Sequence, residues 1–380
     1  MENIPSARRR RLRAWIPGSE TSELIAADIK NKEIKLIDLA SNDYLGLSRH
    51  PKIIEAAQSV MRRDGVGAGG SRLVTGTRPI HQELEGSLAN WLKRERVLVF
   101  PSGFQANLAA VICLANRDTP VIADKLIHHS LLIGVRASRA KLLRFAHNDL
   151  NDLEKKLKAC DQKRYKFHKP LVITESLFSM EGTSPDIKEM TNLCAKHGAY
   201  LFIDEAHALG VMGEKGKGLS YGFNSSTSIM SGTFGKAFGG GGAFLACNSK
   251  IGESLLQTSG AFRYTTALAP PLAAAALEAL NLIATNPHWG LEIKKCATDW
   301  RDSIAEEGWT RPPGNGQILS LLIGEDQEAL NYQNQLEKSG LLSVAIRPPT
   351  VPEKTARLRL VIRRNLPKVA LSKLIKTIKT

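Results

Sequence analysis

The chain has 380 residues, of which 43% are hydrophobic and 23% charged, a composition typical of a soluble globular protein with a large core. Lysine and arginine number 52 against 37 acidic residues, so the formal net charge is +15 and the surface attracts anions. This composition excludes a disordered or collagen-like chain, and no apolar run is long enough to span a bilayer.

The five cysteines are an odd number, lie far apart and form no C-x-x-C pair. Such cysteines usually act as small apolar side chains, so a reducing compartment is favoured and we expect a cytoplasmic protein. The N-terminal segment is rich in arginine, but no apolar stretch follows it as in a secretory signal. Because the basic residues show no zinc-finger spacing or aromatic-interleaved stripe, we do not expect a nucleic acid as partner. We expect no membrane partner either, because the chain lacks an apolar run long enough to span a bilayer.

In chain order, a polar and basic lead over residues 1–45 is followed by alternating β-rich runs and helical patterns. Apolar residues recur every three or four positions in residues 80–91 and 187–194, which predicts helices there. The runs expected as strands are residues 97–100, 121–123, 142–145, 171–174, 200–203 and 243–247. This alternation predicts an α/β fold with a mostly parallel central sheet covered by helices on both faces.

The pattern changes after two consecutive prolines at residues 270 and 271. An Ala/Leu-rich helix is expected over about residues 272–283, and Pro/Gly-rich turns precede two further strands at 318–323 and 358–362. This part is predicted to be a smaller α+β lobe. The expected domains are an N-terminal segment over residues 1–45, a large domain over 46–285 and a C-terminal domain over 286–380.

Lys236 lies in a glycine-rich segment, residues 231–242, between two β-like runs. Glycine lets a bulky ligand approach the backbone, and a lysine amine forms a Schiff base where its surroundings lower its pKa. Thr233 in the same segment can bind a phosphate. A P-loop is excluded because the G-x-x-x-x-G-K-[ST] order is absent. A flexible surface loop with an incidental lysine remains the alternative.

Asp204 follows the apolar run at residues 200–203, with His207 three residues later. An acid at the carboxyl end of a parallel strand faces the ligand-binding edge of such a sheet. There it can pair with the protonated pyridine nitrogen of pyridoxal 5′-phosphate (PLP), and His207 can bind the phenolic oxygen of the ring. The alternatives are a helix N-cap and a Walker-B-like metal acid, and the absence of a P-loop weakens the second.

Two more segments follow strands. Gly103 and Phe104 open an apolar helix after the run at 97–100, an arrangement that offers N–H groups and a positive dipole to a phosphate. His128 and His129 suggest a metal, but no third ligand has suitable spacing, so none is expected. A ring stacked on a flat cofactor and a plain helix-start histidine are the other interpretations. Together the segments supply what a PLP site needs.

With these segments the chain resembles the α-oxoamine synthase family, whose members are fold type I PLP-dependent transferases. The similar segments extend over about residues 35–365 and are 41–47, 69–72, 102–104, 204–207, 233–236, 264–266 and 347–350. Within the family, residues 346–352 and 355–360 most resemble the members that condense L-alanine with a pimeloyl thioester in biotin biosynthesis.

The resemblance assigns catalytic roles to three residues. Lys236 matches the Schiff-base lysine, which also acts as the general base, Asp204 the partner of the ring nitrogen, and His128 the histidine stacked on the ring. The cofactor contacts that it implies are Gly103, Phe104, His128, Ser179, Asp204, His207, Thr233, Lys236 and Thr266. Because Thr266 matches a residue that reaches the phosphate of the neighbouring subunit, a homodimer with active sites at its interface is expected.

The substrate contacts implied by the resemblance are Arg13, Asn42, His128, Thr350 and Arg359, and Arg9 to Arg11 are alternatives to Arg13. The implied reaction joins L-alanine to pimeloyl-CoA or to pimeloyl-acyl carrier protein, with loss of CO2. Glycine C-acetyltransferase and 5-aminolevulinate synthase share the same cofactor residues and are alternatives. A non-catalytic binding or regulatory protein built on a PLP fold is an alternative of another class, and intact Lys236, Asp204 and His207 argue against it.

Overall fold

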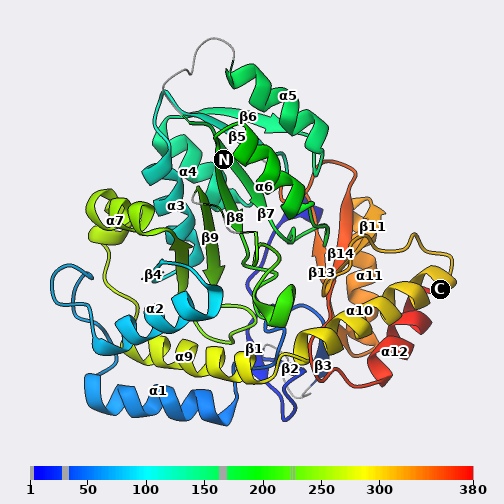
Figure 1. Cartoon of the computed structure of the whole chain (residues 1–380). Helices are drawn as coiled ribbons and strands as arrows, with labels where there is room; N and C mark the ends of the chain where they lie inside the picture. The colour runs from blue at the N-terminus through cyan, green and yellow to red at the C-terminus, as the bar shows by residue number, and fades with distance from the viewer. Residues whose placement is uncertain (1–3, 28–33, 162–168, 224, 226, 380) are drawn as a thin grey trace. The chain divides into compact units, whose positions relative to one another are not determined.

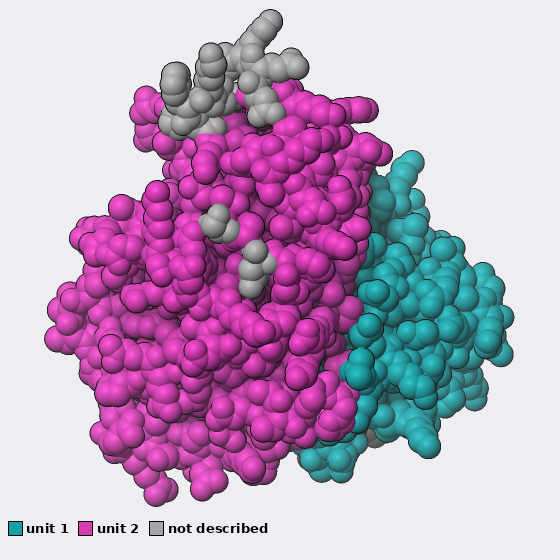
Figure 2. Space-filling model, in the orientation of Figure 1, with its two compact units in different colours: residues 1–46, 179–183, 291–380 teal, residues 47–178, 184–290 magenta. Residues whose placement is uncertain are grey.

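The computed structural model describes residues 4–27, 34–161, 169–223, 225 and 227–379. The chain divides into two compact units, coloured separately in Figure 2. Unit 1 comprises residues 1–46, 179–183 and 291–380, and unit 2 comprises residues 47–178 and 184–290.

Unit 2 is built around a mixed sheet that has seven strands among the described residues, in the order β4-β10-β9-β8-β7-β5-β6 (Figure 1). Strand β10 runs antiparallel to its neighbours β4 and β9, and the pairs from β9 to β6 are parallel. The strands are β4 (Arg96–Phe100), β5 (Pro120–Asp124), β6 (Lys141–Phe145), β7 (Leu171–Glu175), β8 (Tyr200–Asp204), β9 (Ser228–Thr233) and β10 (Ala243–Cys247). The predicted α/β fold with a mostly parallel central sheet is therefore confirmed.

Helices cover both faces of this sheet, because successive strand residues point to opposite sides. In β5, Val121 and Ala123 belong to a core that α3, α4, α7 and α8 complete, whereas Ile122 belongs to the core under α5 and α6. These helices are α3 (Gly103–Leu114), α4 (His129–Ser138), α5 (Leu150–Asp161), α6 (Ile187–Lys196), α7 (Ser249–Thr258) and α8 (Gly260–Arg263). Helices α1 (Pro51–Asp64) and α2 (Pro79–Leu92) each pack against α9 (Pro270–Thr285), and the short helix η2 spans Glu214–Gly216.

Unit 1 contains two smaller sheets in the described residues, with strand orders β1-β2-β3-β12 and β11-β14-β13. The first joins the N-terminal strands β1 (Trp15–Pro17), β2 (Glu23–Ala26) and β3 (Lys35–Asp38) to β12 (Leu341–Leu342). The second consists of β11 (Ile318–Gly324), β13 (Val344–Ile346) and β14 (Ala356–Val361). The helices are η1 (Ser6–Arg8), α10 (Trp289–Glu306), which begins in unit 2, α11 (Asp326–Lys338) and α12 (Val369–Ile378).

The predicted strands agree with the observed ones to within two residues at either end. Strand β9, Ser228–Thr233, is an addition, because the run Ser-Ile-Met-Ser-Gly-Thr has few β-branched residues and reads as part of the glycine-rich segment. Within the described residues, every helix is too short or too polar to cross a membrane.

His81 is a fully buried imidazole in the first turn of α2. Its Nδ1 accepts a hydrogen bond from the Arg78 N–H (2.9 Å), so Nε2 carries the proton and donates to the Leu268 carbonyl oxygen (2.7 Å). Burial lowers the pKa of His81. The folded protein therefore holds this ring neutral at pH values where the unfolded chain is already protonated.

We expect the free energy of unfolding to fall as the pH drops below about 6.5, because the unfolded chain then binds a proton that folded His81 excludes. The slope contributed by this residue is at most about 1.4 kcal/mol per pH unit. Urea unfolding at several pH values checks this, and His81→Gln should flatten the slope. The exposed His288 provides a matched control, His288→Gln, which should keep the wild-type slope.

Candidate active site

Three polar residues lie side by side where β7, β8 and β9 end. Glu175 of β7 is opposite Asp204 of β8, which is opposite Ser231 of β9. These parallel strand ends border a cavity of about 200 Å³ within unit 2. The cavity is lined by Gly103, Phe104, Asn107, His128, Ser130, Glu175, Asp204, Ala206, His207, Ser231, Gly232, Thr233 and Lys236.

Lys236 is held by a glycine-rich segment that is folded back on itself. The Phe234 N–H donates to the Gly242 carbonyl oxygen (2.9 Å), and Phe234 and Phe238 are buried. Gly239 has a φ of +67°, and a Cβ on it would come within 2.3 Å of the Ser48 nitrogen. Since only glycine fits there, the segment is a fixed turn, and the interpretation as a flexible surface loop is wrong. The Lys236 Nζ lies 2.7 Å from the His207 Nε2.

Asp204 is a carboxylate that is only 6% exposed. Its Oδ2 accepts from the Asn107 Nδ2 (2.7 Å), and its Oδ1 accepts from the Ala206 N–H (2.9 Å). Turns rather than a helix follow β8, so Asp204 is not a helix N-cap. Among the residues the structure describes, no basic side chain forms an ion pair with it. A buried carboxylate of this kind suits a ligand with a protonated nitrogen.

His128 is both the N-cap of α4 and a lining residue of the cavity. Its Nδ1 lies 2.7 Å from the Ser130 Oγ and accepts from the Ser130 N–H (3.3 Å). The residue is partly exposed to solvent, and the protein around it lowers the pKa of the imidazole, chiefly by burial. The two sequence interpretations, a helix-start histidine and a ring that faces a flat ligand, are therefore compatible.

The start of α3 lies at the same cavity. Ser102 is its N-cap and accepts from the Gln105 N–H (3.3 Å), and Gly103 and Phe104 form its first positions. Thr233 lines the cavity as well, and its Oγ1 donates to the Gly242 carbonyl oxygen (3.1 Å). N–H groups at a helix start and a nearby hydroxyl match the arrangement expected for a phosphate.

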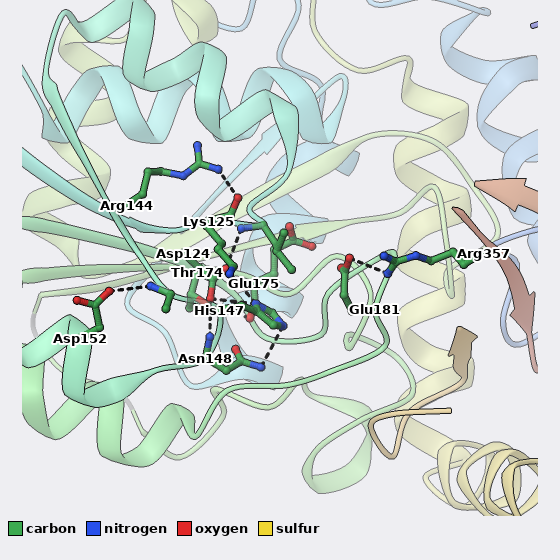
Figure 3. Close-up of polar contacts among 12 residues, drawn as sticks. Asp124, Lys125, Arg144, His147, Asn148, Asp152, Thr174, Glu175, Glu181 and Arg357 are labelled. Atoms are coloured by element: carbon green, nitrogen blue, oxygen red, sulfur yellow. Dashed lines mark hydrogen bonds and ion pairs between the residues drawn. The ribbon is translucent and has the colours of Figure 1, made fainter. Parts of the chain in front are cut away.

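A second hydrogen-bonded group orders the turn between β5 and α4 that carries His128 (Figure 3). Asp124 is fully buried and accepts from the main-chain N–H groups of Leu126 and Asn148, each at 2.8 Å. The His147 Nδ1 lies 3.0 Å from its Oδ1. This carboxylate therefore ties the turn after β5 to the turn after β6.

Several lining residues were missed by the sequence analysis, namely Asn107, Ser130, Glu175, Ala206, Ser231 and Gly232. For Glu175 a signal existed, because it directly follows a predicted strand, as Asp204 does. Asn107 is a lone polar residue in the apolar part of α3, which is a weaker signal. Ser130 and Ser231 carry no signal beyond their neighbours.

Three predicted residues come together within unit 1. Arg359 of β14 donates from Nε to the Ser179 carbonyl oxygen (2.7 Å) and from Nη2 to the Asn42 Oδ1 (2.9 Å). Arg359 is buried and pairs with no carboxylate among the described residues. By contrast, Arg357, two positions earlier, forms an ion pair with Glu181 at 3.0 Å (Figure 3). Arg359 is thus the guanidinium of this strand that suits a carboxylate ligand.

Unit 1 has a hollow of its own, with a volume of about 550 Å³, which is lined by Thr350 and the N-terminal arginines Arg9, Arg10, Arg11 and Arg13. Arg10 donates from Nη2 to the Thr350 Oγ1 (2.7 Å). Arg13 lies over the Trp15 ring at 4.4 Å and forms an ion pair with Glu337 at 2.6 Å. In unit 2, Thr266 forms an isolated β-bridge with Ser71 and does not line the 200 Å³ cavity.

Comparisons with known proteins agree with this geometry. The model of the class I and II aminotransferase family matches residues 34–378. The chain belongs to this family. Proteins named 8-amino-7-oxononanoate synthase from Saccharophagus degradans and Enterobacter sp. are 39% and 38% identical to it, over 88% and 87% of this chain and 84% and 85% of theirs.

Solved structures of this aminotransferase family share the fold. A serine palmitoyltransferase from Sphingomonas wittichii has a TM-score of 0.89 at 25% identity, covering 96% of this chain and 91% of that chain. An 8-amino-7-oxononanoate synthase from Francisella tularensis has a TM-score of 0.77 at 26% identity, covering 90% and 97%. A serine palmitoyltransferase from S. paucimobilis, with a TM-score of 0.89 at 26% identity over 96% and 91%, carries a bound PLP–myriocin adduct. This aminotransferase-family chain is a PLP-dependent enzyme of fold type I, as predicted.

The residues of the cavity fit PLP. The buried carboxylate of Asp204, which has no cationic partner among the described residues, suits a ring nitrogen. The start of α3 suits a phosphate, and the amine of Lys236 suits an aldehyde. The Oγ of buried Ser231, which lines the cavity, has no hydrogen-bond partner in the described part of the chain, so a ligand can supply one.

Proposed function

We propose that this protein condenses L-alanine with a pimeloyl thioester in biotin biosynthesis, releasing 8-amino-7-oxononanoate, CO2 and the free thiol of coenzyme A or of the carrier protein. The acyl donor is pimeloyl-CoA or pimeloyl-acyl carrier protein. The observation that carries the proposal is one cavity in which Lys236, Asp204, His207 and His128 meet, in a chain 38–39% identical to enzymes named for this product.

When bound, PLP supplies an electron sink for negative charge at the α-carbon of an attached amino acid. The Lys236 amine holds the cofactor and, once released from it, takes the α-proton of L-alanine at Nζ as the general base. The neighbouring His207 Nε2 lies 2.7 Å from this amine, within hydrogen-bond distance. We assign His207 also to the phenolic oxygen of the ring.

Asp204 is proposed to hold the protonated ring nitrogen, because its carboxylate is buried and has no cationic partner among the described residues. His128 is proposed to stack on the ring as a neutral imidazole, consistent with its lowered pKa. Gly103, Phe104 and Thr233 are proposed to hold the phosphate and Ser179 to contact the cofactor. These side chains fix the plane of the ring, on which the fate of the α-carbon depends.

For the substrates, Arg359 and Asn42 are proposed to bind the carboxylate of L-alanine, since Arg359 offers a buried guanidinium that pairs with no protein carboxylate in the described residues. His128 also faces this substrate. Thr350 and an N-terminal arginine are proposed to contact the acyl donor. Because Arg10 contacts Thr350, Arg10 is a candidate for this role in addition to Arg13. Either donor suits the +15 chain, because coenzyme A and acyl carrier protein are anionic.

One observation favours a second candidate, the condensation of L-serine with palmitoyl thioester. Serine palmitoyltransferase structures match with TM-scores of 0.86 to 0.90, above the 0.77 of the 8-amino-7-oxononanoate synthase structure. The sequence identity to this chain is 25–26% for the solved structures of both enzymes. The 38–39% identity of the relatives named 8-amino-7-oxononanoate synthase therefore weighs more in the choice of substrates. Glycine as the amino acid, with an acetyl or succinyl donor, is the remaining possibility within the family.

The substrate proposal predicts which pair of substrates reacts. Purified enzyme loaded with PLP is incubated with alanine, glycine or serine and with pimeloyl-, acetyl-, succinyl- or palmitoyl-CoA, and thiol release and CO2 are measured. We expect kcat/KM to be highest for L-alanine with the pimeloyl donor. Lys236→Ala should lower kcat by at least 10⁴-fold, roughly the loss expected for a group that acts as nucleophile and base together.

A matched control is Lys217→Ala, a lysine of the same unit whose Nζ contacts the Tyr221 hydroxyl (3.0 Å) instead of the cavity, and it should retain activity. Preference for serine and palmitoyl-CoA would overturn the substrate proposal while leaving the cofactor site intact. Full activity of Lys236→Ala would overturn the role of the lysine itself.

We also propose a homodimer in which Thr266 reaches the phosphate site of the neighbouring subunit. The Ala267 N–H donates to the Gly70 carbonyl oxygen (3.0 Å), so the segment with Thr266 lies against the loop at residues 65–77. Large apolar side chains are exposed on these two segments, including Val74 (78%) and Tyr264 (80%). Exposed apolar side chains gathered in one region are typical of an interface between subunits.

The dimer proposal predicts that a charge on this surface separates the subunits. Val74→Arg should shift the protein from dimer to monomer in sedimentation velocity and weaken PLP binding, because Thr266 then no longer reaches a partner. Leu322→Arg, at an apolar residue of unit 1 that is 61% exposed, is the control and should remain dimeric. A wild-type chain that sediments as a monomer at micromolar concentration would refute the proposal.

A further inference from the structure

Two buried polar side chains connect Asp204 to His128. The Asn107 Nδ2, on α3, lies 2.7 Å from the Asp204 Oδ2 and 3.0 Å from the Ser130 Oγ. The Ser130 Oγ, on α4, lies 2.7 Å from the His128 Nδ1. Asn107 is 3% exposed and Ser130 is fully buried, and both line the cavity. An unbroken path of three hydrogen bonds therefore joins the carboxylate to the imidazole.

The carboxylate sets the direction of every bond along this path. Asp204 can only accept, so the side of the Asn107 amide that faces it carries N–H, since a carbonyl oxygen 2.7 Å from a carboxylate would be repelled. The second proton of the same nitrogen points to the Ser130 Oγ. With its oxygen accepting, the Ser130 hydroxyl donates its proton to the His128 Nδ1, and the Ser130 N–H points to the same nitrogen (3.3 Å).

One consequence concerns the tautomer of His128. Because two donors are aimed at Nδ1, this nitrogen carries no proton, and the proton of the neutral ring lies on Nε2. The ring also cannot turn about its Cβ–Cγ bond without breaking both contacts. The path thus fixes the proton and the orientation of the imidazole from a carboxylate on a different strand.

We propose that Asn107 and Ser130 are positioning residues. They hold Asp204, which is assigned to the ring nitrogen of PLP, and His128, which is assigned to the face of the ring, in one fixed arrangement. The proposal rests on the proposed roles of Asp204 and His128 toward the cofactor. Neither Asn107 nor Ser130 needs to touch a reacting atom. Their effect passes through the two groups they orient.

A purely structural role is the competing explanation, because α3 and α4 pack together and a buried polar pair between helices must be hydrogen-bonded in any case. The two explanations differ in what the residues affect. A packing pair between α3 and α4 contributes to stability alone, whereas positioning residues also change the affinity for PLP and the tautomer of His128.

The test is a double-mutant cycle on PLP binding to the stripped protein, without amino acid or acyl donor, so that its outcome does not depend on the proposed substrates. The variants are Asn107→Leu, which keeps the branched shape of the side chain and removes the donors, Ser130→Ala, and both together. We expect the Kd for PLP to rise roughly 10- to 100-fold for Asn107→Leu, which removes a bond to a carboxylate, and about 3- to 10-fold for Ser130→Ala. The double variant should match Asn107→Leu within about twofold, because both changes interrupt one path.

A second readout follows the tautomer directly. Two-bond ¹H–¹⁵N spectra of histidine-labelled protein, with the His128 signals assigned by His128→Gln, should show a proton on Nε2 alone in the wild type. Ser130→Ala should give a mixture of tautomers, and Ser130→Thr, which restores the hydroxyl, should return the ring to the wild-type form. This readout remains available if Asn107→Leu does not fold.

Ser259→Ala is the matched control, since Ser259 is a buried serine of unit 2 whose Oγ has no hydrogen-bond partner in the described residues and which does not line the cavity. It should leave both the Kd and the His128 spectrum unchanged. Multiplicative effects of Asn107→Leu and Ser130→Ala on the Kd, or an unchanged tautomer in Ser130→Ala, would overturn the proposal. Loss of PLP binding in the wild-type chain would instead contradict the cofactor site as a whole.

Discussion

The structure depends most on one buried carboxylate. Asp204 ends a central strand of the unit 2 sheet, is 6% exposed, and receives only N–H donors from the described residues around it. Burying an ionised carboxylate without a cation is expensive, so a fold keeps such a group where a ligand completes the pairing. Two neighbouring features meet this constraint, because the Asn107 amide and the Ala206 N–H in the turn after β8 both donate to the carboxylate.

Lys236 shows how backbone geometry places an ordinary residue in a ligand cavity. In isolation it is a lysine among glycines, and the segment around it could equally be a mobile loop. The structure shows instead that Gly239 allows the turn to approach Ser48 closely and that Phe234 and Phe238 anchor it in the core. The amine is thereby delivered to the same cavity as His207 and Asp204, which come from the next strand of the sheet.

Much of this arrangement could be predicted from the sequence because its signals are local. A short apolar run followed by an acid, or by a small residue and a helix, marks the end of a parallel strand, and six predicted cofactor residues beyond Lys236 line one cavity. The N-terminal strands could not be predicted, because β3 is completed by β12, about three hundred positions away in the chain. Asn107 and Ser130 were missed for a related reason. Their importance lies in which side chains they meet, and no local pattern records it.

We propose that Lys236 holds PLP covalently within this cavity. Borohydride reduction of the holoenzyme, which turns a C=N bond between lysine and cofactor into a stable amine, followed by peptide mass spectrometry, tests this role directly. We expect a single phosphopyridoxyl group, located on Lys236. A label on another lysine, or protein that binds PLP and shows no label on Lys236 after reduction, would contradict it.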